Sequence, residues 1–539
     1  MRRFLVAIGE GVLETRAATL LILCALWLTL FAGFRPLMLP DEGRYVGVAW
    51  EMLSSGNWLV PTLDGMPFFH KPPLFYWLTA AGLQVFGAND WAARLASTLA
   101  ALLATVALYA FLRRYADKRL ANLAVVVLVS QPMFFAGAQY ANLDMLVAAM
   151  ISATIVCGAS AILSLERGLP YRIALASAYF FAALGVLAKG LIGFVLPGAI
   201  LLAWLLVRRR YRLIPALLPI PMIVLFLFLA LPWFVWMQAS YGGFWDYFLV
   251  YHHFRRFAET GFNNAQAFWF YVPVLLVGTL PWSPWIVRVF SLTFLADRER
   301  LEVRSLMIVW LLGIVIFFSL PSSKLVGYIF PALPPLACLL ADALLGWLDK
   351  RSSGTASVSG TPSAASTSSA WPGVGVVVAS SACVVFIVLV ALFDRSSSKA
   401  LAKKVAPLFA TGDQIVMVDE YQYDLPFYLR AATNPWVVSD WSDPDIQVRD
   451  NWRKELYDAG RFDPPLVRDR LLLAGDFASR ACADSGGTLW VFGKTAQASA
   501  YPFLPEQAIA FADGKRTVWK LDAGQRRQLS LCAEKPSSG

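Results

Sequence analysis

Six ionisable residues stand at the edges of long apolar runs, and their side chains are of the types that group transfer needs. They are two acids, three lysines and an arginine: Asp41, Asp144, Lys71, Lys189, Lys324 and Arg256. Ionisable groups in such places are costly to keep without a role. Lysine and arginine pair with phosphate through charge-assisted hydrogen bonds, and a carboxylate aligns or deprotonates an acceptor. The set therefore predicts transfer of a group from a lipid phosphate to an acceptor at one membrane surface.

Both acids stand at the start of an expected helix. Asp41 and Glu42 follow a proline, and Asp144 ends the segment Tyr-Ala-Asn-Leu-Asp before a long apolar run. An acid in this position is also a common helix cap, because its oxygens accept hydrogen bonds from the free N–H groups of the first turn. Capping therefore stays open as the alternative reading of each acid.

The cations have a plain alternative as well. Lys71 precedes two prolines and an apolar helix, where a lysine commonly lies at the membrane interface with its ammonium in water. Lys324 follows two serines at the end of another apolar run, and Lys189 has apolar neighbours for many positions on either side. Because burial of Lys189 would be costly, we expect it to have a partner.

The chain has only three histidines, His70, His252 and His253, and all are expected on the same side of the membrane. His253 and Arg256 are three residues apart, which adds an imidazole and a guanidinium to the set. A zinc site is conceivable, with His70 and His253 as ligands, but no metal-ligand spacing is present. We expect no required cofactor and leave a divalent metal open.

Composition indicates that lipid surrounds much of the chain. Of 539 residues, 58% are hydrophobic and 15% are charged, against about 25% charged residues in soluble proteins. The net charge of +10 does not indicate nucleic acid, because the basic residues form short clusters between apolar runs. Eleven charge-poor stretches are long enough to span a membrane, and the predicted range is eleven to thirteen spans. They are 17–34, 95–112, 120–138, 145–165, 173–188, 190–207, 213–237, 266–287, 305–320, 325–347 and 372–393.

The basic clusters fall in alternate connections between these stretches, near residues 2–3, 113–119, 167–172, 208–212, 288–304 and 350–351. With eleven spans, all six lie on one side, which the positive-inside rule makes cytoplasmic. The N-terminus is then cytoplasmic, and its first apolar run is expected to remain as an uncleaved helix. The six ionisable residues above fall on the outer side.

The predicted fold is an α-helical polytopic membrane domain over 1–393, with large outer loops at 35–94 and 238–265. Residues 352–370 are rich in Ser, Thr, Ala and Gly and indicate a flexible cytoplasmic linker. Residues 394–539 have short apolar runs that resemble strands, such as 415–418, 436–438 and 489–492, separated by helical pieces. They predict a soluble α/β or α+β domain on the outer, periplasmic face.

Two of the six cysteines, Cys482 and Cys532, fall in this outer domain, where a disulfide persists. We leave open whether they form one or are two free thiols. The other four, Cys24, Cys157, Cys338 and Cys383, fall in apolar segments and are expected to be inert packing residues.

Several of these segments resemble the GT-C glycosyltransferases of the protein mannosyltransferase and aminoarabinose transferase (ArnT) families. The shared stretches are Asp41–Tyr45, His70–Trp77, Asp144, Ala188–Gly190 and Ser323–Pro331. The segments 244–257, 268–271 and 280–282 and the tail motif Tyr423–Arg430 resemble ArnT specifically. In that family an acid often stands directly before the lysine and before the histidine, where this chain has His70 and His252.

The resemblance implies an inner-membrane enzyme that moves 4-amino-4-deoxy-L-arabinose from undecaprenyl phosphate to a lipid A phosphate. It implies Asp41 and Asp144 as catalytic acids, and it implies that cations bind the donor phosphate: Lys71, Lys189, Arg256 and Lys324. Supporting contacts would come from Glu42, Arg44, Tyr45, His70, His253 and Tyr328. Because no side-chain nucleophile is evident, we expect a single displacement with inversion.

Other readings remain to be weighed against this one. Another polyprenyl-phosphate-linked sugar, such as a hexose, could be moved to a hydroxyl of protein, lipopolysaccharide core or glycan. In that case Asp41 would be a base, whereas an ionised phosphate acceptor needs none. A transporter would place polar residues near the bilayer midplane, and here they gather at one end of the spans. A structural or anchoring protein would not need this set of acids, lysines and histidines.

Overall fold

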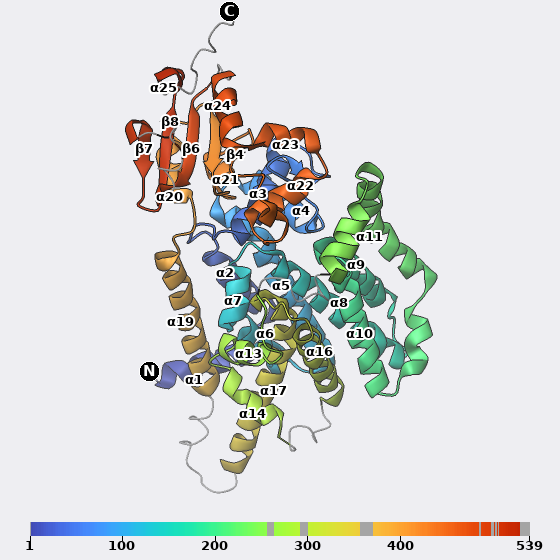
Figure 1. Ribbon diagram of the computed structural model, residues 1–539. Coiled ribbons are helices and arrows are strands. Elements are labelled where there is room, and N and C mark those ends of the chain that lie inside the picture. The colour runs from blue at the N-terminus through green and yellow to red at the C-terminus, as the bar shows by residue number, and fades with distance from the viewer. Residues whose placement is uncertain are drawn as a thin grey trace, which may run out of the picture. The chain divides into compact units, whose positions relative to one another are not determined.

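The computed structural model describes residues 2–255, 264–291, 300–355, 370–483, 487–496, 501, 504 and 506–528 (Figure 1). The chain divides into two compact units. The helical unit comprises Met1–Arg35, Arg94–Ala239 and Trp245–Phe393. The sheet unit comprises Pro36–Ala93, Ser240–Phe244 and Asp394–Gly539. Each is described by itself.

Helices make up the helical unit. Its α-helices are α1 (Arg2–Glu14), α2 (Ala17–Leu30), α5 (Asp90–Tyr115), α6 (Lys118–Ser130), α7 (Pro132–Ala138), α8 (Leu143–Glu166), α9 (Arg172–Lys189), α10 (Ile192–Val207), α11 (Ile220–Ser240), α13 (Tyr271–Gly278), α14 (Ile286–Val289), α16 (Leu301–Ser319), α17 (Leu333–Thr355) and α19 (Ala370–Phe393). Shorter 3₁₀ and π segments are η1 (Tyr211–Leu217), η2 (Asp246–Arg255), η3 (Ser283–Trp285) and η4 (Val326–Ala332).

Among the described residues, seven helices are long and apolar enough to cross a membrane, and ten spans result if each of three bent pairs counts as one. Each of the eleven predicted stretches contains apolar helix, and the chain is a multi-pass membrane protein. The count differs from the prediction for two reasons. α10 has only 16 residues, and two stretches predicted as straight spans are bent, α6 with α7 by 69° and α13 with α14 by 118°. Proline begins α7, and it cannot continue the hydrogen-bonding of the preceding helix.

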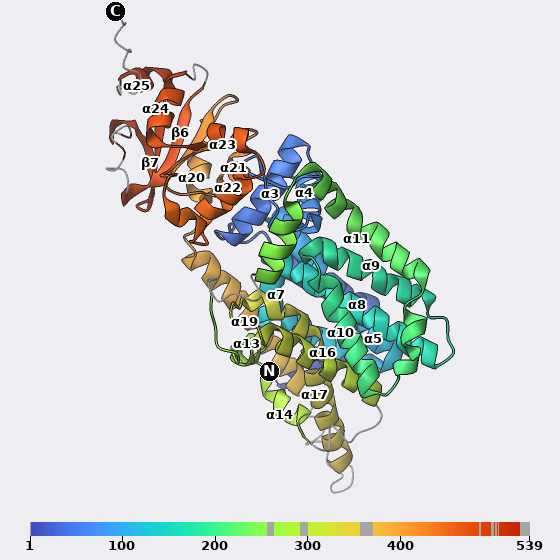
Figure 2. The ribbon, with the colours of Figure 1, turned by 45° about the vertical axis from the view of Figure 1, so that its right-hand side comes forward.

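The core of the helical unit is built around α8, in which 89% of the most apolar stretch is buried. It packs against α9, α10 and η4, and α8, α9 and α10 lie side by side in both ribbon views (Figure 2). Gly185 of α9 and Gly193 of α10 allow a close approach, because an added Cβ on Gly193 would lie 2.1 Å from a backbone atom of Gly185. The first turn of α8 and the last turn of α9 carry two of the predicted site residues, Asp144 and Lys189.

A six-stranded sheet forms the centre of the sheet unit, with strand order β5-β4-β3-β6-β8-β7. The strands are β3 (Gln414–Val418), β4 (Trp436–Val438), β5 (Leu471–Leu472), β6 (Leu489–Lys494), β7 (Ile509–Ala512) and β8 (Arg516–Leu521). β5, β4, β3 and β6 are mutually parallel. β8 runs antiparallel to both of its neighbours, β6 and β7. The three runs predicted as strands are therefore β3, β4 and β6, and the C-terminal α/β prediction is confirmed.

Short helices connect and flank these strands: α20 (Lys399–Val405), α21 (Leu425–Leu429), η5 (Pro444–Gln447), α22 (Trp452–Gly460), α23 (Pro464–Arg470), α24 (Ala474–Ala483), η7 (Glu506–Ala508) and α25 (Ala523–Gln528). Parallel strands need crossover connections, and helices commonly supply them. Valine, leucine and tryptophan side chains from β3, β4, β6 and β8 form one buried cluster with Phe477 of α24. The sheet therefore has an apolar core of its own.

The segment predicted to be the first outer loop is part of this same unit. It contains α3 (Asp41–Ser55), the two-stranded β1 (Thr62–Leu63) and β2 (Met66–Pro67), and α4 (Leu74–Phe86). α3 packs against α21 and α4. Gly43 and Gly47 lie one turn apart on α3, and a Cβ at Gly47 would lie 2.8 Å from the carbonyl oxygen of Tyr423. The sequence assigned this loop to the 1–393 domain, whereas its packing joins it to 394–539.

Other predicted segments are described in part. The linker 352–370 overlaps the end of α17 and the start of α19, and residues 356–369 lie outside the described residues. Cys24, Cys157, Cys338 and Cys383 are free. Cys482 is disulfide-bonded, and Cys532, its expected partner, lies outside the described residues.

Candidate functional site

Asp41 is a half-exposed acid held by a less exposed arginine. It is the first residue of α3, and its side chain is 41% exposed. Arg44, one turn later, donates a hydrogen bond of 2.6 Å from Nη2 to Oδ1 of Asp41. The other carboxylate oxygen has no hydrogen bond to the described residues. Asp41 is thus oriented through one oxygen, and the other oxygen is left for a further contact.

Arg44 is itself fixed from the far side by the C-terminal segment of the sheet unit. Its Nη1 donates to Oε1 of the buried Glu455 in α22, and the hydroxyl of Tyr423 donates to Oε2 of the same carboxylate at 2.6 Å. Burial lowers the pKa of Arg44, but the neighbouring Glu455, Tyr45 and Asp41 outweigh burial and raise it well above its usual value. Arg44 therefore stays charged and links the buried Glu455 to the half-exposed Asp41.

Glu42 and Tyr45 make further contacts at the start of α3. Glu42 is fully buried, and its Oε2 accepts a hydrogen bond of 2.8 Å from the backbone N–H of Met38. The guanidinium of Arg44 lies 5.4 Å from the ring centroid of Tyr45. Glu42 is therefore the acid that satisfies local backbone here, and Asp41 makes no side-chain capping bond.

Asp144 has the opposite environment. It is the second residue of α8 and is 7% exposed. The helix cap is Asn142, whose side-chain oxygen accepts from the N–H of Asp144 at 2.8 Å. Oδ1 of Asp144 forms an ion pair with the ammonium of Lys189 at the end of α9. Asp144 is therefore engaged in a buried pair, and the predicted need of Lys189 for a partner is met.

Tyr328 and Gly327 of η4 close this second cluster. The Lys189 ammonium lies 4.2 Å from the ring centroid of Tyr328, a cation–π contact that strengthens when water is excluded. A Cβ on Gly327 would lie 2.3 Å from Oδ2 of Asp144, so glycine is the residue that lets η4 pack on the carboxylate. Three predicted residues, Asp144, Lys189 and Tyr328, are thus brought together.

Lys324 is buried in a turn of the backbone. It is 3% exposed, and its ammonium donates to the carbonyl oxygens of Pro321 and Gln266, the latter at 3.0 Å. Its own N–H bonds the carbonyl of Asn264 at 3.1 Å. Burial lowers the pKa of Lys324. These bonds tie the segment before α13 to the segment before η4, and they use two of the three donors of the ammonium.

The four remaining predicted residues are described to different extents. Lys71 and His70 are half-buried in the segment between β2 and α4, where the His70 ring lies 4.2 Å from that of Phe68. His253 lies in η2, whose side chains there are not described, and Arg256 lies outside the described residues. Among the described residues no group of three or more His, Cys, Asp or Glu side chains could hold a metal ion. A metal at His70 and His253 remains a prediction.

A second pair of acids comprises Glu51 of α3 and Asp64 in the turn between β1 and β2. The carboxylate of Glu51 accepts hydrogen bonds from the N–H groups of Asp64 and Gly65, at 2.7 and 2.9 Å, and from the hydroxyl of Thr62. Burial raises the pKa of Glu51 to about 7. Asp64 is fully buried, and neither of its carboxylate oxygens has a hydrogen-bond partner among the described residues. Burial and the nearby Glu51 raise the pKa of Asp64 well above its usual value.

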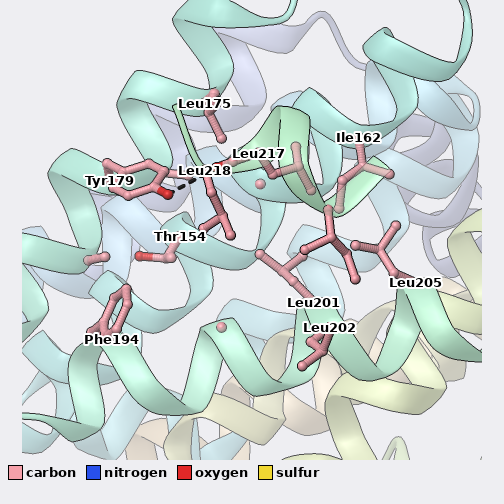
Figure 3. Close-up of a pocket in the computed structure, with 15 residues that line it drawn as sticks. Thr154, Ile162, Leu175, Tyr179, Phe194, Leu201, Leu202, Leu205, Leu217 and Leu218 are labelled. Atoms are coloured by element: carbon pink, nitrogen blue, oxygen red, sulfur yellow. Dashed lines mark hydrogen bonds between the residues drawn. The ribbon is translucent and has the colours of Figure 1, made fainter. Parts of the chain in front are cut away.

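An apolar cavity of about 270 Å³ lies within the helical unit, between α8, α9, α10 and η1. Figure 3 shows leucine side chains of α10 and η1 directed at it, together with Thr154 and Tyr179. The Tyr179 hydroxyl donates to the carbonyl of Leu217 at 2.9 Å, which fastens η1 to α9. The lining of this cavity is almost entirely apolar and suits a hydrocarbon chain. It includes none of the predicted site residues.

Sequence reasoning missed two contributors to the Asp41 cluster. Glu455 was not singled out, because a single glutamate in an amphipathic helix 411 positions away carries no local signal. The sequence marks Tyr423 only as the first residue of the motif Tyr423–Arg430. The glycine pair at 43 and 47 is the one sequence feature that indicates a close helix contact at this place.

The described residues thus form a multi-pass membrane protein that holds acids and cations in polar clusters at helix ends. Residues 70–236 match the model of the dolichyl-phosphate-mannose-protein mannosyltransferase family. This match covers less than a third of the chain and includes Lys71, Asp144 and Lys189.

More particular similarity is to ArnT. The chain is 32% identical over 319 residues to an undecaprenyl phosphate-alpha-4-amino-4-deoxy-L-arabinose arabinosyl transferase of Pseudomonas savastanoi pv. phaseolicola. It is 30% identical over 341 residues to a protein of the same name from Pectobacterium carotovorum. These matches cover 59% and 62% of this chain and 59% and 60% of the relatives, about three fifths of their length. The resemblance seen in the short motifs is confirmed.

Solved structures extend the likeness to the whole fold. ArnT from Cupriavidus metallidurans bound to undecaprenyl phosphate superposes with a TM-score of 0.77 at 22% identity, covering 94% of this chain and 98% of that one. The oligosaccharyltransferase AglB from Archaeoglobus fulgidus gives a TM-score of 0.53 at 13% identity, with 91% and 71% covered. The chain therefore has the GT-C type fold, as predicted from its sequence.

Proposed function

We propose that the protein transfers 4-amino-4-deoxy-L-arabinose from undecaprenyl phosphate to a phosphate of lipid A, at the outer face of the inner membrane. The observation that carries the proposal is the oriented, half-exposed carboxylate of Asp41, held by an arginine that a buried acid fixes in turn. The similarity to arabinosyl transferases supports the identity of the sugar and its carrier. The basic clusters support the orientation, with the N-terminus in the cytoplasm.

The reaction is a single displacement at the anomeric carbon. An oxygen of the acceptor forms the new bond to that carbon, the bond from the carbon to the donor phosphate oxygen breaks, and undecaprenyl phosphate leaves with the electron pair. The configuration inverts, because no side-chain nucleophile intervenes. The leaving phosphate needs positive charge near it rather than a proton, and we assign this role to Lys71, Arg256 and Lys189.

Asp41 acts on the acceptor side or on the sugar. A phosphate acceptor is already ionised and requires no base. In that case the free oxygen of Asp41 holds the sugar's ammonium group or orients the acceptor, while Arg44 keeps the carboxylate in one direction. Glu455 and Tyr423 are positioning residues, since they act through Arg44.

Asp144 has a different role in this proposal. Its ion pair with Lys189 and its contact with Gly327 leave it buried, so we assign it to positioning Lys189 rather than to touching the acceptor. Lys324 supports the site by tying two chain segments together through its carbonyl contacts. No metal is needed for these steps.

A second candidate is transfer of another polyprenyl-phosphate-linked sugar to a hydroxyl group. The match of residues 70–236 to the mannosyltransferase family model favours it. Asp41 would then be the general base, because a hydroxyl must lose its proton during the attack. Its free oxygen meets the geometric requirement for that role as well.

Purified protein separates the two. We expect it to form a labelled lipid A product from undecaprenyl-phosphate-linked 4-amino-4-deoxy-L-arabinose, and to form none from a mannose-linked carrier with a serine peptide. The same assay with Asp41→Asn tests the site. Product from the mannose carrier alone would replace the first function with the second.

A further inference from the structure

A pocket of about 460 Å³ lies at the carboxyl ends of the central strands β3 and β6 of the six-stranded sheet. Four of its lining residues are cations that come from three separate segments: Arg395, Lys494, Lys515 and Arg516. The one acid that lines it is Glu420. All of these residues belong to the sheet unit, and none belongs to the clusters around Asp41 or Asp144.

The strand order places this pocket where open α/β sheets bind ligands. From β3 the chain proceeds outward through β4 to β5, and then returns to form β6 on the other side of β3. The order reverses between β3 and β6, and a crevice forms outside the carboxyl ends of strands at such a switch point. Glu420 follows β3 by two residues, and Lys494 is the last residue of β6. Arg516 begins β8 directly opposite Lys494.

The charges around the pocket are unbalanced. Arg395, Lys494 and Lys515 are exposed, and none of their side chains has an ion pair with the described residues. The carboxylate of Glu420 is already engaged by Arg516 at 3.4 Å and by the amide of Gln422. Like charges brought together repel, and a bound anion would relieve that repulsion through charge-assisted hydrogen bonds.

The pocket is also tied to the membrane surface by the chain itself. Arg395 follows Phe393, the last residue of α19, by two positions. A chain extends at most about 3.6 Å per residue, so Arg395 lies within roughly 7 Å of the end of an apolar helix that is long enough to span a bilayer. One wall of the pocket therefore begins two residues after the end of that helix.

We propose that this pocket is a binding site for a phosphorylated lipid headgroup, formed at the switch point of the sheet and separate from the reacting centre. The anion chemistry follows from the pocket itself. The choice of a lipid, the acceptor of the reaction, rests on the proposed function. The pocket then holds a phosphate of the acceptor lipid while its reacting group is engaged elsewhere.

A charge-reversal pair tests the anion site. In Lys494→Glu with Lys515→Glu, two lining cations become acids, and full-length protein in detergent is titrated with inorganic pyrophosphate. The control pair, Lys403→Glu with Arg468→Glu, changes the net charge equally at two exposed positions of the same unit that do not line the pocket. We expect the pyrophosphate Kd to rise at least about tenfold, a change of ~1.4 kcal/mol, in the pocket pair alone. Equal Kd values in both pairs and the native chain would overturn the site.

Transfer kinetics test the lipid. If the pocket holds the acceptor headgroup, the pocket pair raises the KM for lipid A while kcat and the KM for the donor stay as in the control pair. An unchanged KM for lipid A, with pyrophosphate binding lost, would mean that the pocket takes a soluble anion and that the lipid assignment is wrong. If the native chain transfers nothing to lipid A, the proposed function fails, and the pyrophosphate titration still decides the anion site.

Discussion

Asp41 and Asp144 both lie in the first turn of a helix, and their surroundings are opposite. Asp41 has a side chain that is 41% exposed, with one oxygen on Arg44 and the other open. Asp144 has a side chain that is 9% exposed and packs between Lys189 and the backbone of η4 at Gly327. The same residue type at the start of a helix is half-exposed in one cluster and largely buried in an ion pair in the other.

The neighbours of each acid explain the difference. Arg44 is neutralised by Glu455 behind it, so its contact with Asp41 orients the carboxylate without enclosing it. Lys189 lies at the end of a helix, where the helix dipole favours a cation, and Asp144 is its one ion-pair partner among the described residues. Residue type alone does not separate an accessible acid from a buried one.

The largest expected effect is at Asp41. Replacement by Asn keeps the hydrogen bond from Arg44 but removes the negative charge, so we expect transfer to fall by about 10²–10⁴-fold, the usual contribution of a positioned acid or base. Initial rates of lipid A modification by purified protein measure this. Asp476→Asn, an exposed acid of α24, is the matched control and should keep the native rate.

The Asp144 pair should respond in stability instead. Asp144→Asn leaves Lys189 buried without a counter-charge, and breaking a buried pair in this way costs about 3–5 kcal/mol. We expect a clearly lower thermal unfolding midpoint in detergent. Adding Lys189→Met removes the orphaned charge and should restore most of the lost stability.

Activity of that double variant sharpens the comparison. Because Asp144 is assigned to positioning, we expect measurable transfer with a raised KM for the donor. A double variant that folds like the native protein and transfers nothing would return Asp144 to the catalytic role that the family resemblance implies.

A smaller effect is expected at the contact between α3 and the C-terminal segment. Gly47→Ala puts a Cβ 2.8 Å from the carbonyl oxygen of Tyr423, so α3 must shift, at a cost of about 1–3 kcal/mol. The shift should loosen the Arg44–Glu455 link and raise the KM of transfer. Gly475→Ala in α24, where a Cβ meets nothing within 4 Å, should leave the unfolding midpoint and the KM unchanged.

The smallest effect concerns pH. Because burial raises the pKa values of Asp64 and Glu51, the folded protein holds these protons more tightly than the unfolded chain. Each group therefore contributes stability below its ordinary pKa, and this contribution is lost as pH rises through the folded-state pKa. For Glu51 the loss occurs between its usual pKa of 4.5 and about 7.

Asp64→Asn removes one of these acids, and asparagine tolerates the positive φ of 56° at this position. We expect the variant to match the native unfolding midpoint near about pH 4 and to exceed it by about 1 kcal/mol near pH 8. A variant less stable than the native chain at the higher pH would show that Asp64 is ionised and paired in the folded protein.

Much of the fold was predictable from local sequence. Apolar runs located the membrane helices and the strands β3, β4 and β6, because burial requires such runs whatever the partners are. The bends between α6 and α7 and between α13 and α14 were not predicted. Prolines stand at both places, but a proline within a long apolar run does not by itself tell a straight or kinked span from a sharp bend. The inclusion of 36–93 in the sheet unit was not predicted either, because it depends on contacts hundreds of residues apart.

The candidate site divides in the same way. The pairing of Lys189 was expected from its apolar surroundings, and Asp144 is the partner. The role of Glu455 and the capture of Lys324 by backbone carbonyls were not expected. Both depend on which distant segment packs beside the residue, and the flanking sequence carries no record of that.

Mass spectrometry of lipid A tests the central assignment most directly. Cells that lack this gene are compared with the same cells carrying the native gene or the Asp41→Asn variant at matched abundance. The assignment predicts a lipid A species heavier by one aminopentose with the native gene, and its absence in the other two strains. The same species in cells without the gene, or undiminished with Asp41→Asn, would contradict it.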